Sequence, residues 1–113
     1  MRRPSALISS MPFAVETAIK RLGANLRVAR LRRNLTLEEV AQKLGVSRYV
    51  IAHAEGGKPS TSVAVYAGLL WTYGLLDQFA ELADPVKDKE GLALSLANER
   101  SRARRIETLD NDF

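Results

Sequence analysis

The chain has 113 residues, of which 46% are hydrophobic and 27% charged, a composition typical of one small globular domain. It contains no cysteine and one histidine, His53, which excludes disulfide frameworks, cysteine-based zinc sites, thiol nucleophiles and relays of two imidazoles. No apolar run approaches the roughly 18 residues that span a bilayer, and the start of the chain lacks the apolar stretch of a signal peptide. We therefore expect a cytoplasmic, non-catalytic protein that uses no cofactor, no metal and no membrane.

The net charge of +4 is unevenly distributed along the chain. Residues 1–33 contain eight basic residues and one acidic residue, whereas residues 34–85 contain three basic and six acidic ones. Residues 86–113 contain six of each kind. Such a local positive charge is typical of a face that meets an anion, such as nucleic acid or an acidic partner.

The first predicted helix covers about residues 12–33 and follows a segment, residues 1–11, that we expect to be flexible. Pro12 suits a first helical turn, and apolar residues then recur at steps of four and three. Gly23 inside this helix costs about 1 kcal/mol relative to alanine and allows a break there. Asn34 is expected to end the helix because asparagine tolerates the left-handed conformation.

A second and a third helix follow with clear start and stop signals. Thr36 and Glu39 form a predicted capping box, in which each side chain accepts a hydrogen bond from the backbone amide of the other residue. Gly45 stops this helix, and Ser47 caps the next one after a very short connection. The paired glycines after Glu55 are expected to end the third helix.

The remaining pattern predicts a fourth helix from about residue 61 to 73 and a fifth from 77 to 83. Asp84 and Pro85 then break the pattern. Residues 87–91 read as a solvated linker, residues 92–106 can form a helix, and residues 110–113 read as a disordered tail. We therefore predict a DNA-binding and dimerisation domain over residues 12–84 and a charged linker, helix and tail over residues 85–113.

Residues 36–56 contain a helix, a tight glycine turn and a second helix, and a strongly basic helix precedes them. This arrangement is typical of a helix-turn-helix, whose first helix crosses the DNA backbone while the second enters the major groove. The motif favours binding of double-stranded DNA.

The sequence resembles the Xre group of lambda-repressor-like helix-turn-helix proteins over about residues 22–76. The residues that carry the resemblance are Leu22, Gly23, Arg27, Arg30, Leu35, Thr36, Glu39, Val40, Ala41, Leu44, Gly45, Val46, Ser47, Ile51, Glu55, Gly56 and Gly57. It implies an all-α fold, with a five-helix DNA-binding domain, an N-terminal helical extension and a charged C-terminal tail. It also implies that the recognition helix begins at Ser47.

The resemblance implies that Arg48, Tyr49, Ala52 and His53 of the recognition helix face bases or phosphates. Beside them we expect further DNA-binding residues, namely Ser47, Lys58, Arg27, Arg32, Arg33 and Thr36, with the arginines binding phosphates. A structural ion pair is implied between Arg30 and Glu55. Leu37 stands where the family often has glutamine, and Ala52 is too short for a hydrogen bond to a base, although it can touch a thymine methyl.

A second set of segments comprises Phe13 to Arg33, Tyr66 to Leu70, Leu75, Leu82 to Asp84, and Lys89 to Gly91 followed by an arginine-rich end. Through these segments most of the chain resembles, more loosely, the HipB-like antitoxins. This resemblance implies a homodimer that binds operator DNA, represses its own operon and holds a HipA-type kinase toxin. A standalone repressor and, less favoured, a small enzyme are the alternatives. We expect Trp71, Leu76 and Phe79 at the dimer interface, while the cluster Arg100 to Arg105 can be a solvated tail, a DNA contact or a toxin-docking surface.

Overall fold

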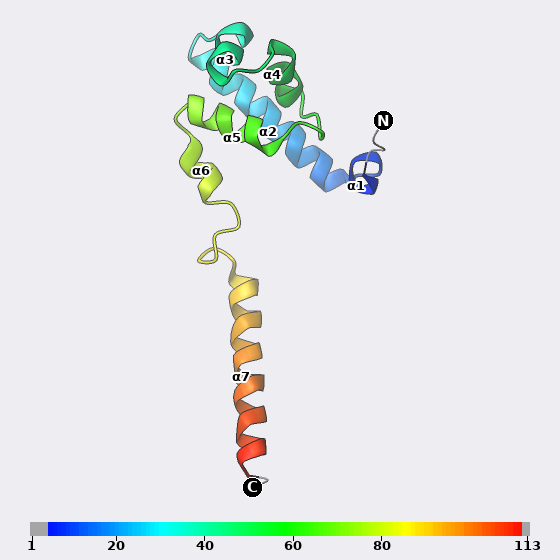
Figure 1. Cartoon of the computed structure of the whole chain (residues 1–113), viewed down its shortest axis with the longest axis vertical. Coiled ribbons are helices and arrows are strands. Elements are labelled where there is room, and N and C mark those ends of the chain that lie inside the picture. Colours follow the sequence, from blue (N-terminus) through cyan, green and yellow to red (C-terminus); the bar gives the residue numbers. More distant parts are fainter. Residues whose placement is uncertain (1–4, 112–113) are drawn as a thin grey trace. The chain divides into compact units, whose positions relative to one another are not determined.

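The computed structural model describes residues 5–111, and this part of the chain contains helices and no strand, which confirms the predicted all-α class. Figure 1 shows the order of the elements along the chain. The helices are α1 (Ala6–Ser9), α2 (Phe13–Arg32), α3 (Leu37–Leu44), α4 (Arg48–Glu55), α5 (Val63–Thr72), α6 (Leu76–Ala80) and α7 (Lys89–Asn111). The chain divides into two compact units, one ending at Phe79 and the other beginning at Ala80.

Helix α2 is continuous through Gly23, so the break that the glycine allowed does not occur. Gly23 is buried, and a Cβ atom at this position would lie 2.5 Å from the backbone oxygen of Ala54 and 2.6 Å from that of Glu55. The glycine therefore permits close approach of the end of α4 to α2. Asn34 has a φ of 54°, so the chain leaves α2 through the left-handed conformation that was expected there.

The turn between α3 and α4 follows the local sequence signals closely. Thr36 Oγ1 accepts from the amide of Glu39 at 3.1 Å, and Glu39 Oε1 accepts from the amide of Thr36 at 3.2 Å, which confirms the capping box. Gly45 has a φ of 68°, a conformation that glycine adopts without steric cost. Ser47 Oγ accepts from the amide of Val50 and caps α4.

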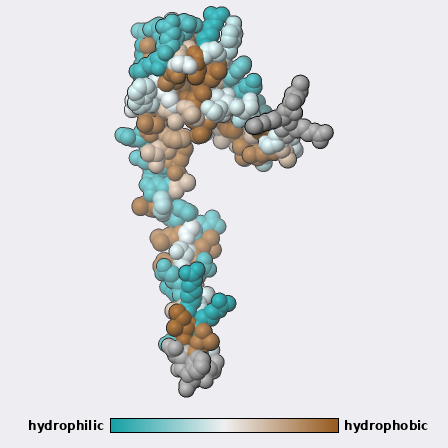
Figure 2. Space-filling model, in the orientation of Figure 1, coloured by the Kyte–Doolittle hydropathy of each residue, from teal (hydrophilic) through white to brown (hydrophobic). Residues whose placement is uncertain are grey.

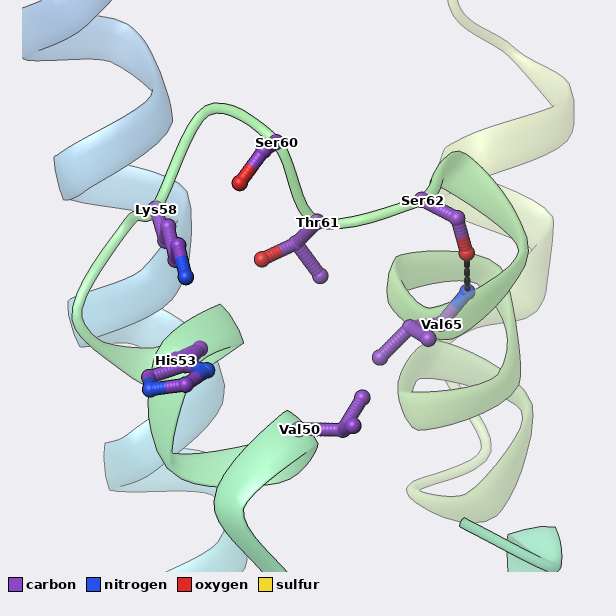
Figure 3. Close-up of a pocket in the computed structure, with 7 residues that line it drawn as sticks. All are labelled: Val50, His53, Lys58, Ser60, Thr61, Ser62 and Val65. Atoms are coloured by element: carbon purple, nitrogen blue, oxygen red, sulfur yellow. Dashed lines mark hydrogen bonds between the residues drawn. The ribbon is translucent and has the colours of Figure 1, made fainter. Parts of the chain in front are cut away.

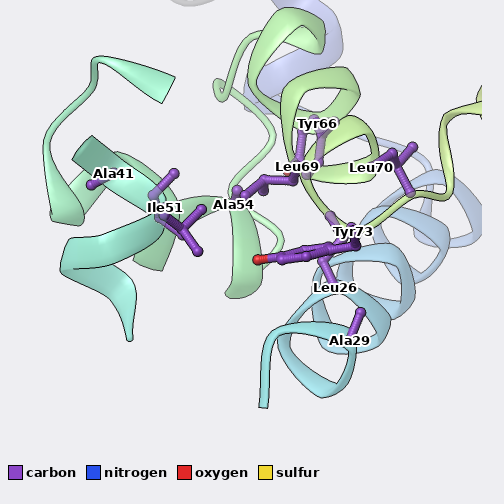
Figure 4. Close-up of a cluster of buried hydrophobic side chains, with 10 residues drawn as sticks. Leu26, Ala29, Ala41, Ile51, Ala54, Tyr66, Leu69, Leu70 and Tyr73 are labelled. Atoms are coloured by element: carbon purple, nitrogen blue, oxygen red, sulfur yellow. The ribbon is translucent and has the colours of Figure 1, made fainter. Parts of the chain in front are cut away.

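The core of the first unit lies between α2, α3, α4 and α5 (Figure 4). Its most deeply buried large side chains are Leu26, Val40, Ile51 and Leu69, one from each of these helices. Burial of one such side chain contributes about 1.5–3 kcal/mol to folding. Because α2, α3, α4 and α5 all contribute to one core, the orientation of α4 is fixed by its packing.

Two segments outside this core differ from the expected helix boundaries. The N-terminal segment contains α1, which Ser5 Oγ caps by accepting from the amide of Ile8 at 3.2 Å. Helix α6 ends at Ala80, three residues before the expected end, and Ala83 has a φ of 56°.

Helix α7 is longer than residues 92–106 and begins inside the expected linker. Asp88 Oδ1 accepts from the amide of Gly91 at 2.9 Å, an N-terminal capping contact that the sequence reading missed. The expected tail lies partly in α7, and residues 112–113 lie outside the described residues. Hydrophobic and hydrophilic side chains alternate along this helix (Figure 2), and from Leu92 to Leu109 every side chain is exposed.

Candidate nucleic-acid interface

Helix α4 has one face in the core and one face in solvent. Ile51 and Ala54 are fully buried. The exposed residues Arg48, Tyr49, Ala52 and His53 share the opposite face, because positions three and four apart lie one turn apart on an α-helix. The structure therefore gathers on one surface the four side chains that the resemblance assigned to the recognition helix.

A buried ion pair holds the end of α4 against α2. Arg30 Nε donates to Glu55 Oε2 at 2.7 Å and Nη2 donates to Oε1 at 3.0 Å, while Nη1 donates to the backbone oxygen of Leu35 at 2.9 Å. The Arg30 and Glu55 side chains are only 9% and 6% exposed. The hydrogen bond to Glu55 raises the pKa of Arg30, against the opposing effect of burial. One guanidinium thus connects α2, the start of α3 and the end of α4.

A polar hollow lies on one side of the exposed face of α4 (Figure 3). It is lined by Val50, His53, Lys58, Ser60, Thr61, Ser62 and Val65. The side chains of His53, Lys58 and Thr61 point toward its centre. Its volume is about 230 Å³, below the roughly 300–1,000 Å³ of usual ligand pockets, and it offers hydroxyl groups and an ammonium group. Such a hollow suits a phosphate group better than a cofactor.

An apolar groove lies on the other side of α4, next to the N-terminus of α3. It is lined by Arg30, Leu31, Asn34, Leu35, Thr36, Leu37, Glu38, Arg48, Tyr49 and Ala52. Leu31, Leu35 and Leu37 are all at least partly exposed there, so the groove presents aliphatic surface beside α4. The exposed face of α4 therefore forms a ridge between a polar hollow and an apolar groove.

The Arg48 side chain is held by its neighbour. Arg48 Nη2 donates to the Tyr49 hydroxyl oxygen at 3.3 Å, and the guanidinium carbon lies 5.2 Å from the centre of the Tyr49 ring. At this distance the ring face attracts the cation. The guanidinium is thus partly ordered before any ligand binds.

The three arginines of the first predicted helix that were expected to bind DNA do not share one face. Arg27 lies one turn before Leu31, on the side of α2 that borders the apolar groove. Arg32 lies two residues after Arg30, about 200° around the helix, and so points away from α4. Arg33, the C-cap residue of α2, donates to the backbone oxygens of Ala29 and Tyr73, each at 2.9 Å.

Helical spacing therefore puts Arg27 on the same side of α2 as the groove residue Leu31, whereas Arg32 and Arg33 lie elsewhere. Conversely, Ser60 and Thr61 of the polar hollow and Leu31 of the apolar groove were missed by the sequence reading. The run of three hydroxyl residues that follows Lys58 and Pro59 was the available signal for the first two. For Leu31 the signal was its helical spacing from Arg27.

The residues expected at a dimer interface differ in exposure. Trp71 is 57% exposed and Leu76 is 39% exposed, whereas Phe79 packs against the core. The ammonium group of Lys43 lies 5.0 Å from the centre of the Trp71 ring. Trp71 and Leu76 therefore expose surface to a partner, whereas Phe79 is partly buried against the core.

Residues 5–111 contain neither a potential metal site nor a helix that could span a membrane. Within residues 5–111, no three His, Cys, Asp or Glu residues are grouped so that they could hold a metal ion. In the same range, no helix combines the length and apolar character needed to cross a bilayer.

Comparison with known proteins identifies the family. A family model described as a helix-turn-helix domain matches residues 21–82, which is more than half of the chain. Searches among curated proteins and among solved structures each gave no match. The matched range contains the capped turn between α3 and α4, the Arg30–Glu55 pair and the exposed α4 ridge. The chain therefore belongs to the helix-turn-helix domain family of DNA-binding proteins.

Proposed function

We propose that this protein is a sequence-specific transcriptional regulator that binds operator DNA as a homodimer, with α4 in the major groove. The observation that carries the proposal is the division of α4 into two faces. The core and the Arg30–Glu55 pair fix its inner face, while Arg48, Tyr49, Ala52 and His53 project from the outer face. A rigidly held helix with an unobstructed polar face is what major-groove reading requires.

The surroundings of α4 supply contacts for the DNA backbone. In the polar hollow, Lys58, Ser60 and Thr61 can bind phosphate oxygens, as can Ser47 and Thr36 at the helix starts. Arg27 adds positive charge on the groove side of α2. These contacts position the protein on DNA, and α4 supplies the sequence preference.

The homodimer is supported by Trp71 and Leu76, which expose large apolar surfaces on α5 and α6. Two copies of α4 would then occupy half-sites about one helical turn apart, roughly 34–36 Å. The predicted operator is consequently an inverted repeat.

Selection from a random DNA library with the full-length protein tests this function. The expected result is enrichment of an inverted repeat, with binding that weakens steeply as salt rises. Arg48→Ala should reduce the preference for this operator over random DNA by about 1–3 kcal/mol. Lys58→Ala should weaken binding to both DNAs equally and flatten the salt dependence.

Arg32→Ala is the matched control, because Arg32 lies on α2 but points away from α4. The preference of this variant for the operator over random DNA should stay at the wild-type level. If no sequence is enriched, or if Arg48→Ala loses no more preference for the operator than Arg32→Ala, the proposal is wrong.

The resemblance to HipB-like proteins supports a more specific role, that of an antitoxin and autorepressor bound to a HipA-type kinase toxin. The exposed cluster Arg100, Arg102, Arg104 and Arg105 on α7 offers a surface for such a partner. A neighbouring gene for a kinase-like protein, and co-purification of its product with the untagged chain, would support this role. Absence of both would favour a standalone repressor.

A further inference from the structure

We infer that each operator half-site read by α4 contains a guanine that Arg48 binds and a nearby thymine whose methyl group packs against Leu37 and Ala52. This inference rests on the proposed function and specifies which base chemistry the site accepts. Its basis is the pairing, in one groove, of a pre-ordered guanidinium with an aliphatic wall.

The guanidinium of Arg48 is suited to guanine. In the major groove guanine presents two acceptors, O6 and N7, which match the paired donors of arginine. Arg48 is the first residue of α4 and lies on its outer face. The ring and hydroxyl of Tyr49 restrict its conformations, so less side-chain entropy is lost on binding. Tyr49 therefore acts as a positioning residue for Arg48.

The aliphatic wall is suited to thymine. Neither Leu37 nor Ala52 has a side-chain donor or acceptor, so neither can recognise a base by hydrogen bonding. The C5-methyl of thymine is the apolar group that unmodified DNA presents in the major groove. Leu31 and Leu35 extend the same apolar surface. A methyl group buried there leaves water, whereas a polar base edge would lose its hydrogen bonds to water.

The charge of the groove also favours a base edge over a phosphate. Of the charged residues that line the groove, Arg30 is already paired with Glu55, and Glu38 at the start of α3 offsets the charge of Arg48, so the groove holds little net positive charge for a phosphate group. The polar hollow on the opposite side of α4 instead contains Lys58 and hydroxyl groups. The polar hollow is therefore the better site for a phosphate group, whereas the apolar surface of the groove is the better site for a base edge.

Helix geometry limits the distance between the two bases. Arg48 and Ala52 are four residues apart, which is about 5.4–6 Å along the helix. Successive base pairs rise about 3.4 Å. The guanine and the thymine are therefore expected within two base-pair steps of each other.

The test uses the selected operator with single-atom changes in the DNA and the full-length protein. At one guanine, 7-deazaguanine removes N7, one of the two acceptors, and should weaken wild-type binding about 2- to 12-fold, roughly half the free energy of a bidentate contact. This penalty should disappear in Arg48→Ala. It should persist in Tyr49→Phe, which keeps the stacked ring, and shrink in Tyr49→Leu, which does not.

At one nearby thymine, replacement by deoxyuridine removes only the methyl group and should weaken wild-type binding roughly fourfold. Leu37→Gln should reduce this penalty, because Ala52 is then the only one of the two apolar contacts that remains. Lys58→Ala is the control: it should weaken all binding but leave both base-analogue penalties unchanged.

The inference is overturned if the protein selects an operator but neither analogue has an effect, or if the guanine penalty survives in Arg48→Ala. In those cases the proposed function still stands, because an operator was selected. If no operator is selected at all, both the proposed function and this inference fail.

Discussion

The two faces of α4 differ in what holds them and in what they can do. Ile51 and Ala54 are fully buried on the inner face, and Glu55 is tied to Arg30 by two hydrogen bonds. Arg48 and His53 on the outer face are exposed and do not contribute to the core. On this eight-residue helix, the residues that stabilise the fold and the residues available for recognition therefore lie on opposite faces. Substitutions on the two faces should have distinct consequences.

The largest effect is expected from breaking the buried ion pair. Glu55→Ala leaves the guanidinium of Arg30 buried without its carboxylate and should lower the free energy of unfolding by about 3–5 kcal/mol. The double substitution Arg30→Met with Glu55→Leu should recover most of this loss, because apolar residues of similar volume replace the pair. Urea unfolding measures both variants. Equal instability of the single and double variants would contradict this account.

A smaller but still clear effect is expected at Gly23. Alanine is the better helix former by about 1 kcal/mol, yet its Cβ would lie 2.5 Å from the oxygen of Ala54. We therefore expect Gly23→Ala to lower the free energy of unfolding by about 1–3 kcal/mol and to weaken operator binding by displacing α4. Asn25→Ala, at an exposed position on the same helix, is the control and should be neutral or slightly stabilising. Stabilisation by Gly23→Ala would show that α4 can move away without cost.

Substitution of Tyr73, unlike that of Glu55 or Gly23, is expected to stabilise the protein. Its hydroxyl is buried and has no hydrogen-bond partner within the described residues. Tyr73→Phe removes this unsatisfied group and should raise the free energy of unfolding by about 1 kcal/mol, measured by urea unfolding near pH 7. Tyr66→Phe, which removes a hydroxyl that donates to the backbone oxygen of Lys58, is the matched control and should be destabilising. The prediction is wrong if both variants lose stability.

Tyr73 should also make stability depend on alkaline pH. Burial, and then the charge of Glu55, raise the pKa of Tyr73 to about 12. The unfolded chain releases this proton near pH 10, whereas the folded protein retains it. The stabilisation that comes from this difference in pKa between the folded and the unfolded chain is therefore complete below pH 10 and is lost as the pH rises toward 12. Unfolding at pH 9 and pH 11 should show a steeper loss for the wild type than for Tyr73→Phe.

The smallest effects on stability are expected on the outer face of α4. Arg48→Ala and His53→Ala should change the free energy of unfolding by less than about 0.5 kcal/mol, because neither side chain is buried. Arg48→Ala should nevertheless lose operator preference. A large loss of stability in either variant would mean that the two faces are not independent.

Features that depend on residues close together in the chain could be predicted from the amino-acid sequence. The Thr36–Glu39 capping box, the left-handed Gly45 and the Ser47 cap all occur as expected, because each uses contacts within three or four positions. These signals define the helix-turn-helix, and with it the face of α4 that carries Arg48 and His53. The Arg30–Glu55 pair was accessible only through the resemblance, since nothing local relates residues 25 positions apart.

Contacts between segments far apart in the chain became visible only in the folded structure. In the folded structure Gly23 packs closely against α4, and Arg33 donates to the backbone oxygen of Tyr73, 40 residues away. Arg32 points away from the recognition surface. The fold also forms the polar hollow and the apolar groove from segments that are separate in sequence. Periodicity indicates which residues share a face of a helix, but the side of that helix that meets a neighbour is set by the packing of the whole core.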